Sequence, residues 1–303
     1  MRPGTRTVNI PQVTYNNKNR IIKVCAGIGD NIWLLQKLLN THEKFNFSIT
    51  GDVPQRGKQI FDLCPMVVAD SKYDFDFTSD DVINKSYTYN SWTHYKHHTF
   101  FLSMNTHLEE GNRIEEFIPD LETTFYPQYN TISEKPIADH LLKDSNKKYV
   151  GIYTSGYSVL RHWNFWREYE WFKVIQYLFS KNSDYVFVLL GAEYDLDINA
   201  NLLKLLDAYK IPYVNTVGQL RLGTVVEVMK RLHYFLSFPS GLGILATTLK
   251  TPTLMFYPPH LEKMINTWAH PADIYNLNYK GMLFCEPEEA LTWIETKYRL
   301  FDR

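Results

Sequence analysis

The stretch Arg20-Ile-Ile-Lys-Val-Cys-Ala-Gly-Ile-Gly-Asp30 predicts the first part of an alternating α/β fold. Residues 20–26 are typical of a short buried strand, and the two glycines allow a tight turn directly after it. We expect a helix over residues 31–39, because apolar side chains recur there at helical spacing: Ile32, Leu35, Leu38 and Leu39. A strand, a glycine turn and a helix are the start of a βαβ unit with a parallel sheet.

This alternation continues to about residue 70, blurs from Ser71 to about Lys148 and then restarts; within the blurred stretch, the polar residues 130–148 predict a linker. Before the linker, strands are predicted over residues 45–50 and 66–69, with a helix over 58–63. After it, strands are predicted over residues 148–154, 185–190, 213–215, 234–237 and 253–257, and helices over 168–179, 200–209, 222–232, 241–249 and 287–301. The sequence thus predicts two α/β domains, residues 1–145 and 146–303, with right-handed crossovers between parallel strands.

Composition excludes several classes of protein. The hydrophobic content of 45% supplies folded cores, so the chain is not a disordered one. The three cysteines are widely spaced, which argues against a disulfide scaffold and against a cysteine-based zinc site. No apolar run is long enough to span a bilayer, and residues 1–7 lack the apolar core of a secretory signal, so we expect a cytoplasmic protein.

Open α/β sheets bind ligands beyond the carboxyl ends of their strands, so residues that follow each predicted strand are candidate site residues. After the first strand, Gly29 lets the backbone come close to a ligand, and Asp30 is an acid at the start of a helix. Asp30 would act as a general base or, alternatively, would only cap that helix. A dinucleotide fingerprint would need a glycine where the chain has Ile32, so a NAD site is poorly supported.

Two further candidates lie in the second domain. The turn Thr154-Ser155-Gly156 offers hydroxyls after a strand, and Arg161 adds a forked cation that suits a diphosphate. Ser240 and Gly241 open a helix, whose first N–H groups favour an anion. The alternatives are an ordinary polar loop in which Arg161 pairs with a surface acid, and a plain N-cap role for Ser240.

The order of these motifs resembles that of the ADP-heptose:lipopolysaccharide heptosyltransferase family. That family has a Gly-Asp helix start, a hydroxyl turn before a basic residue and Trp, a strand ending in Gly-Ala-Glu, a Ser-x-Asp-[ST]-Gly-x-x-His helix start and a Thr-Pro-Thr strand. The matching stretches here are Gly29-Asp30-Asn31-Ile32, Thr154-Ser155-Gly156, Arg161-His162-Trp163, Leu190-Gly191-Ala192-Glu193, residues 237–244 and residues 251–258. Three positions depart from the pattern: Pro239 and Ile244 replace its Asp and His, and Pro258 replaces a glycine.

The resemblance implies a GT-B glycosyltransferase of hexosyl- or heptosyl-transferase type, with two Rossmann-like domains facing each other across a cleft. It implies that the last helix packs back on the N-terminal domain. It also implies a metal-independent, inverting transfer from a nucleotide sugar, which is a co-substrate, to an acceptor hydroxyl, with no cofactor. Asp30 would be the base, and Arg161 would stabilise the leaving diphosphate. The donor would bind Gly29, Thr154, Ser155, Gly156, Glu193, Ser240 and Gly241, with Glu193 at the ribose hydroxyls.

The aromatic and histidine-rich residues 87–101 leave the acceptor open. Three histidines there, His94, His97 and His98, lack the acidic partner of a zinc-binding helix, so no metal site is predicted. Trp92 and Tyr95 are candidates for stacking on an acceptor, or else for packing in a core. A saccharide is one acceptor class. With the basic arm of residues 2–23, a hydroxymethylated DNA base is an alternative acceptor. The second alternative is a non-catalytic module of the same fold that binds nucleotide sugars or glycans.

Overall fold

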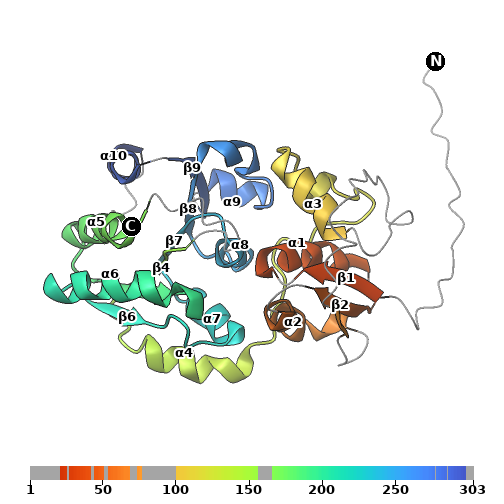
Figure 1. The fold of residues 1–303 in the computed structure, drawn as a ribbon, viewed down its shortest axis with the longest axis horizontal. Helices are drawn as coiled ribbons and strands as arrows, with labels where there is room; N and C mark the ends of the chain where they lie inside the picture. The colour runs from red at the N-terminus through yellow and green to blue at the C-terminus, as the bar shows by residue number, and fades with distance from the viewer. Residues whose placement is uncertain are drawn as a thin grey trace, which may run out of the picture.

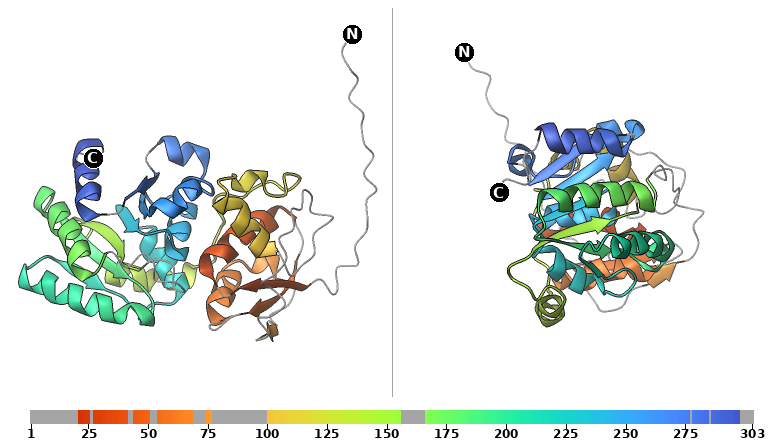
Figure 2. Two further views of the ribbon diagram at one scale, coloured as in Figure 1. Left: turned by 45° about the horizontal axis from the view of Figure 1, so that its top comes forward. Right: turned by 90° about the vertical axis from the view of Figure 1, so that its left-hand side faces the viewer.

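The computed structural model describes residues 21–25, 27–41, 44–50, 54–68, 74–76, 100–155, 166–276, 278–284 and 286–297. Two α/β units lie next to each other along the long axis of the molecule (Figures 1 and 2). Helix α4, Lys135–Leu141, belongs to the segment that connects them. No helix in the described part of the chain is long and apolar enough to cross a membrane.

The N-terminal unit is built on a parallel sheet of order β1-β2-β3. Its elements are β1 (Ile21–Cys25), α1 (Ile28–Leu38), β2 (Asn46–Thr50), α2 (Pro54–Asp62), β3 (Asp74–Asp76) and α3 (Phe100–Glu109). The strand predicted over residues 66–69 is wrong, because Pro65–Val67 forms a 3₁₀ helix and Val68 makes only a bridge with Phe45. A proline at the first position of a helical turn favours that turn, and the apolar run after it is too short to compete.

The C-terminal unit has a six-stranded parallel sheet of order β6-β5-β4-β7-β8-β9. Its strands are β4 (Lys148–Tyr153), β5 (Tyr185–Leu190), β6 (Tyr213–Asn215), β7 (Tyr234–Ser237), β8 (Thr253–Tyr257) and β9 (Tyr279–Leu283). Its helices are α5 (Glu168–Lys181), α6 (Leu196–Ala208), α7 (Leu222–Met229), α8 (Gly241–Thr248), α9 (Pro271–Tyr275) and α10 (Pro287–Lys297). This is the strand order of a Rossmann sheet. All strands are parallel, and the order in which they follow one another across the sheet reverses between β4 and β7.

The last helix packs within the C-terminal unit. Helix α10 lies beside α5 (Figure 1), and Lys173 of α5 pairs with Glu288 of α10 at 2.6 Å. Ala290 and Ile294 are buried in the same core as α5. The expectation that this helix packs back on the N-terminal domain is therefore wrong for residues 287–297. Its narrow apolar stripe could cover any apolar helix face, and here it covers the buried face of α5.

One hydrophobic core is continuous between the two units. It extends from Val24 and α1 through α8 to Trp268 and Tyr279 of the C-terminal unit. The rings of Trp33 and Trp268 meet across the boundary with centroids 5.2 Å apart. A second core, on the opposite face of the six-stranded sheet, surrounds Trp171. Each large apolar side chain that is fully buried stabilises the folded state by about 1.5–3 kcal/mol, so apolar packing holds the two units together.

A buried lysine fastens α1 to the segment that follows α3. Lys37 is fully buried and donates to the carbonyl oxygens of Glu115 (3.3 Å) and Leu121 (3.1 Å). Burial lowers the pKa of Lys37 to about 8, although Glu115 and Asp120 act in the opposite direction. The same segment reaches the C-terminal unit, because the Ile114 N–H donates to the carbonyl of residue 267 (2.9 Å). The position of α1 is thus tied to both units.

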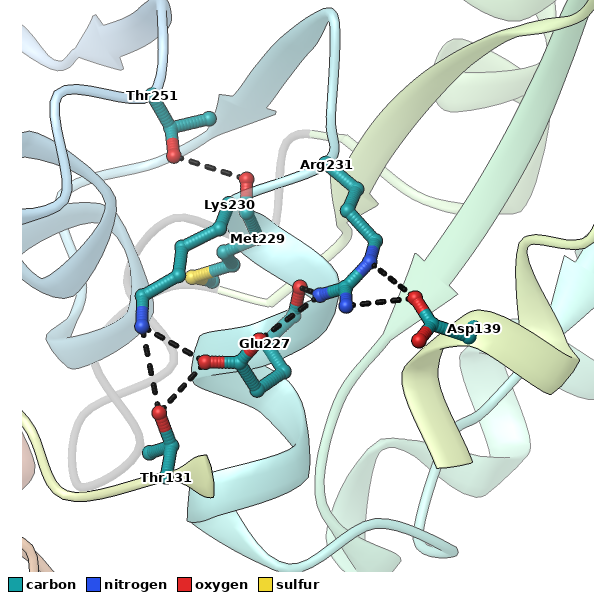
Figure 3. A network of polar contacts seen from close by, with 7 residues as sticks. All are labelled: Thr131, Asp139, Glu227, Met229, Lys230, Arg231 and Thr251. Carbon is teal, nitrogen blue, oxygen red and sulfur yellow. Dashed lines mark hydrogen bonds and ion pairs between the residues drawn. The ribbon is translucent and has the colours of Figure 1, made fainter. Parts of the chain in front are cut away.

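A buried carboxylate joins the linker to α7 (Figure 3). Glu227 accepts hydrogen bonds from Thr131 (2.6 Å), Lys230 (2.7 Å) and Arg231 (3.0 Å), and Arg231 also donates to Asp139 of α4 (2.7 Å). Burial alone would raise the pKa of Glu227, but these hydrogen bonds outweigh it and lower the pKa to about 2. The network therefore requires the ionised form of Glu227.

We predict that Glu227→Gln lowers the free energy of unfolding by about 2 kcal/mol at pH 7, because Lys230 and Arg231 lose their shared counter-charge. The folded pKa lies below the unfolded value of 4.5, so the unfolded chain takes up the proton first as the pH falls. The stabilisation is therefore complete above about pH 4.5 and is lost as the pH approaches 2. Urea unfolding at several pH values measures both effects. The exposed Glu122→Gln is the control, with an expected change within about 0.5 kcal/mol. Equal stability of Glu227→Gln and wild type at pH 7 would contradict the assignment.

Candidate active site

Three loops leave the C-terminal sheet side by side, at the carboxyl ends of its central strands. Tyr153, the last residue of β4, pairs with Leu190 of β5 on one side and with Ser237 of β7 on the other. The strand order reverses between β4 and β7. Open parallel sheets bind ligands at this point of reversal, so the loops after these strands form a candidate binding edge.

The parallel register brings predicted donor-binding residues to this edge. Thr154 and Ser155 follow β4, Glu193 follows β5, and Ser240 and Gly241 follow β7. Thr154 is buried, Ser155 is half-buried and Glu193 is exposed. Residues that are far apart in the sequence therefore line one edge of the sheet.

Helix α8 begins at this edge with Ser240 as its N-cap. The Ser240 hydroxyl accepts a hydrogen bond from the Gly243 N–H (3.1 Å), so the N-cap interpretation of Ser240 is confirmed. The N–H groups of Gly241 and Leu242 belong to the first turn and have no acceptor within the helix. Together with the positive end of the helix dipole, they favour an anion such as a phosphate at this point.

The first turns of α1 and α8 touch through two glycines. A Cβ atom on Gly241 would lie 2.9 Å from the nitrogen of Gly29 and 3.0 Å from Cβ of Ile28. A Cβ atom on Gly29 would lie 3.3 Å from Cα of Gly241. Residues without a side chain allow this close approach of two backbones. The contact places the start of α1, from the N-terminal unit, against the N-terminal end of α8 (Figure 1).

The contact between Gly29 and Gly241 places Asp30 at the same edge of the C-terminal sheet. Helix α1 begins at Ile28 with Gly27 as its N-cap, earlier than expected, so Asp30 lies within the first helical turn. The alternative in which Asp30 caps a helix starting at Asn31 is therefore wrong. A carboxylate is favoured in the first turn of a helix. Asp30 is half-buried where the positive ends of two helices meet.

Ile244 occupies the position at which the resembled family has a histidine, and its side chain packs in the contact between α1 and α8. Ile244 is buried, and a Cβ atom on Gly29 would lie 2.6 Å from its Cδ1 atom. This position therefore contributes apolar packing between the two units. It offers no polar group to a ligand.

A buried polar cluster that we did not predict supports the loops after β4 and β5. The Asn199 amide donates to Thr154 Oγ1 (3.0 Å) and to the carbonyl of Asp195 (2.8 Å). The Asp195 carboxylate accepts from the Ala192 N–H (2.8 Å), which holds the turn that precedes Glu193. Asn199 and Asp195 are each 1% exposed. The cluster thus joins the loops after β4 and β5, both of which carry predicted donor-binding residues.

The sequence does contain a signal for this cluster. Asn199 shares the buried face of α6 with Leu202 and Leu206, at spacings of three and seven residues. A polar residue within an apolar helical stripe indicates a buried hydrogen-bonding partner. The partner itself lies in another loop and could not be named from periodicity.

Several predicted residues lie outside the described part of the chain: Gly156, Arg161, Trp92, Tyr95, His94, His97 and His98. Among the residues that the structure describes, no group of three or more His, Cys, Asp or Glu side chains is placed to hold a metal ion. The described edge combines a carboxylate, two helix N-termini and hydroxyl groups. Such an edge can bind a phosphate and present a base to a neighbouring hydroxyl.

The sequence model of glycosyltransferase family 9 (heptosyltransferase) matches residues 115–290, which is more than half of the chain. The chain belongs to glycosyltransferase family 9. The predicted family and the predicted enzyme class, a glycosyltransferase, are thereby confirmed. The match includes the loops after β4, β5 and β7, but it begins at residue 115 and so leaves out Gly29 and Asp30. No curated protein matches the chain significantly.

Solved structures of family 9 and related enzymes share the fold. A family 9 glycosyltransferase from Veillonella parvula DSM 2008 is 11% identical, with a TM-score of 0.58 over 94% of this chain and 97% of that one. E. coli ADP-heptose LPS heptosyltransferase II is 12% identical, with a TM-score of 0.53 over 93% and 98%. E. coli heptosyltransferase WaaC, solved with ADP, is 14% identical, with a TM-score of 0.50 over 91% and 99%. At these identities the likeness shows the fold, and the prediction of a GT-B fold is confirmed.

We predict that Gly241→Ala lowers the free energy of unfolding of this family 9 protein by about 1–3 kcal/mol, because the added Cβ meets the backbone of Gly29. Gly29→Ala is expected to cost less, because the nearest atom is the end of the Ile244 side chain, which can rotate. Ile244→Val removes that atom. Added to Gly29→Ala, it should restore the free energy of unfolding, whereas added to Gly241→Ala it should not. Chemical unfolding of the single and double variants measures these differences. Wild-type stability of Gly241→Ala would show that the two helices are not in contact.

Proposed function

We propose that this family 9 enzyme transfers a sugar from a nucleotide sugar to an acceptor hydroxyl, with inversion and without a metal ion. The observation that carries the proposal is the contact between Gly29 and Gly241. It joins the acid of the N-terminal unit, Asp30, to the anion-binding edge of the C-terminal unit. A base and a phosphate site beside each other are the two parts that such a transfer requires.

The diphosphate of the donor would bind at the start of α8. The N–H groups of Gly241 and Leu242 point along the helix axis toward that position, and the hydroxyl turn Thr154-Ser155-Gly156 adds further donors. Arg161 would bind phosphate oxygens through its forked guanidinium. These groups supply the positive potential that a divalent cation would otherwise supply, so the scheme needs no metal and no cofactor.

Glu193 would recognise the nucleoside. It lies exposed at the turn after β5, which the buried Asp195 carboxylate holds in place. A carboxylate is an acceptor with two oxygens and suits the vicinal hydroxyls of a ribose. Gly218, with a φ of 70°, lies directly against Glu193 and lets the neighbouring loop pass close to it.

Asp30 would act as the general base. Its carboxylate takes the proton from the acceptor hydroxyl while the acceptor oxygen attacks the anomeric carbon. The bond between that carbon and the β-phosphate oxygen breaks, and the diphosphate leaves with the electron pair. Attack from the face opposite the leaving group inverts the anomeric configuration. The charge that develops on the β-phosphate is stabilised by the helix start and by Arg161.

The donor sugar and the acceptor are open to experiment. One structural relative is an ADP-heptose LPS heptosyltransferase and another was solved with ADP, so ADP-sugars are the first donors to test. Ile244 in place of a polar residue indicates that sugar recognition differs from that of the resembled family. We propose a saccharide as the acceptor class, with Trp92 and Tyr95 as candidate acceptor residues.

A thermal-shift panel of UDP-, GDP- and ADP-sugars tests the donor part of this proposal. We expect at least one of them to raise the melting temperature in a concentration-dependent manner, because ligands that bind only the folded state stabilise it. The anomeric configuration of the product of the best donor then tests inversion. Absence of a shift with every donor would count against the proposed reaction.

We predict that Asp30→Asn lowers kcat by about 10²–10⁴-fold while donor affinity stays within about twofold, since the amide keeps the shape of the carboxylate and loses its basicity. Release of nucleoside diphosphate in the presence of a saccharide acceptor panel measures kcat. Asp197→Asn is the matched control, because Asp197 is an exposed acid in the first turn of α6. Unchanged kcat in Asp30→Asn would exclude Asp30 as the base.

A further inference from the structure

The Asn199 side-chain amide has one orientation that satisfies its neighbours. The carbonyl oxygen of Asp195 lies 2.8 Å from the amide nitrogen, and a carbonyl can only accept. The group that faces it must therefore be the NH₂ group. Its second hydrogen then points to Thr154 Oγ1, at 3.0 Å. Both hydrogens of the amide are used, and both neighbours accept.

The consequence concerns the hydroxyl of Thr154. A hydroxyl that accepts from Asn199 keeps its own hydrogen to donate elsewhere. Among the described residues, the only hydrogen bond of the Thr154 hydroxyl is the one from Asn199. A hydroxyl that already accepts a hydrogen bond is also polarised and becomes a stronger donor.

The backbone of Thr154 is fixed as well. Its carbonyl oxygen accepts a hydrogen bond from the indole nitrogen of Trp171 (3.1 Å), and Trp171 is fully buried. Thr154 is the first residue after β4, next to the point where the strand order reverses. Thr154 is itself 2% exposed, so a preset hydroxyl donor lies just under the surface of the edge where an anionic ligand is expected.

We propose that Asn199 is a positioning residue for the donor: it orients the Thr154 hydroxyl as a hydrogen-bond donor toward the diphosphate. The inference deepens the proposed function and rests on it, since it needs a nucleotide at this edge. Asn199 acts through Thr154 and does not itself touch the ligand. Its second hydrogen bond, to Asp195, ties the same hydroxyl to the turn that presents Glu193.

Titration calorimetry with ADP, GDP and UDP tests the inference, using whichever binds wild type most tightly. We expect Asn199→Ala and Thr154→Val each to weaken binding by about tenfold, the effect of one lost hydrogen bond to a charged group. Thr154→Ser keeps the hydroxyl and should bind within about twofold of wild type. The double variant should bind no more weakly than Thr154→Val alone, because Asn199 acts through that hydroxyl.

The matched control is Thr251→Val. Thr251 is 4% exposed and donates to the carbonyl of Met229 (2.9 Å), so it loses a comparable buried hydrogen bond before β8, at the opposite edge of the sheet (Figure 3). It should bind the nucleotide like wild type, with a melting temperature lowered to an extent similar to that of Asn199→Ala.

Two results would overturn the inference while leaving the proposed function intact. In one, Asn199→Ala binds the nucleotide as tightly as Thr251→Val. In the other, the effects of Asn199→Ala and Thr154→Val multiply in the double variant. If wild type binds none of the three nucleotides, the proposed function fails, and the inference fails with it.

Discussion

The close approach of Gly29 and Gly241 is the constraint on which the candidate site depends. Both residues lie in the first turn of a helix, so the contact joins two positive helix ends. Such an arrangement is unfavourable unless negative charge lies nearby, and Asp30 in the first turn of α1 provides some of it. A bound diphosphate would provide more. The same contact that joins the two units thus places two helix N-termini beside an acid, which is where we propose that the diphosphate binds.

The remainder of the structure keeps that contact in place. The core that includes Trp33 and Trp268 is continuous between the units, and Lys37 fastens α1 to a segment that is itself bonded to the C-terminal unit. On the linker side, Glu227 of α7 binds Thr131 and the two basic residues that directly follow the helix, Lys230 and Arg231. Apolar packing and buried polar contacts therefore act on both sides of the glycine pair. Any change that shifts α1 relative to α8 has to break several of them together.

Much of the C-terminal unit could be predicted from local sequence. Residues 185–190, 213–215, 234–237 and 253–257 were expected as strands and are strands with those bounds, because each is a short apolar run between turn residues. The prediction over residues 66–69 failed because Pro65 favours a 3₁₀ turn over so short a run. The apolar stripe of α10 indicates that one side of the helix is buried, but the periodicity does not identify the element that the helix packs against.

The contacts that build the site are long-range and were harder to foresee. The motif order placed Thr154, Ser240 and Gly241 at one sheet edge, and the structure agrees. The pairing of Gly29 with Gly241 has no side-chain signal, since it depends on the absence of side chains. Asn199 carries a signal, a polar residue on an apolar face, but the identity of its partner depends on how two strands lie in the sheet.

A crystal structure of the wild-type protein with a bound nucleoside diphosphate tests the central claim most directly. We predict that its phosphates lie at the start of α8, with an oxygen within hydrogen-bond distance of the Gly241 or Leu242 N–H and with Asp30 on the side where an acceptor would enter. A nucleotide bound elsewhere, with the first turns of α1 and α8 free of phosphate, would contradict it.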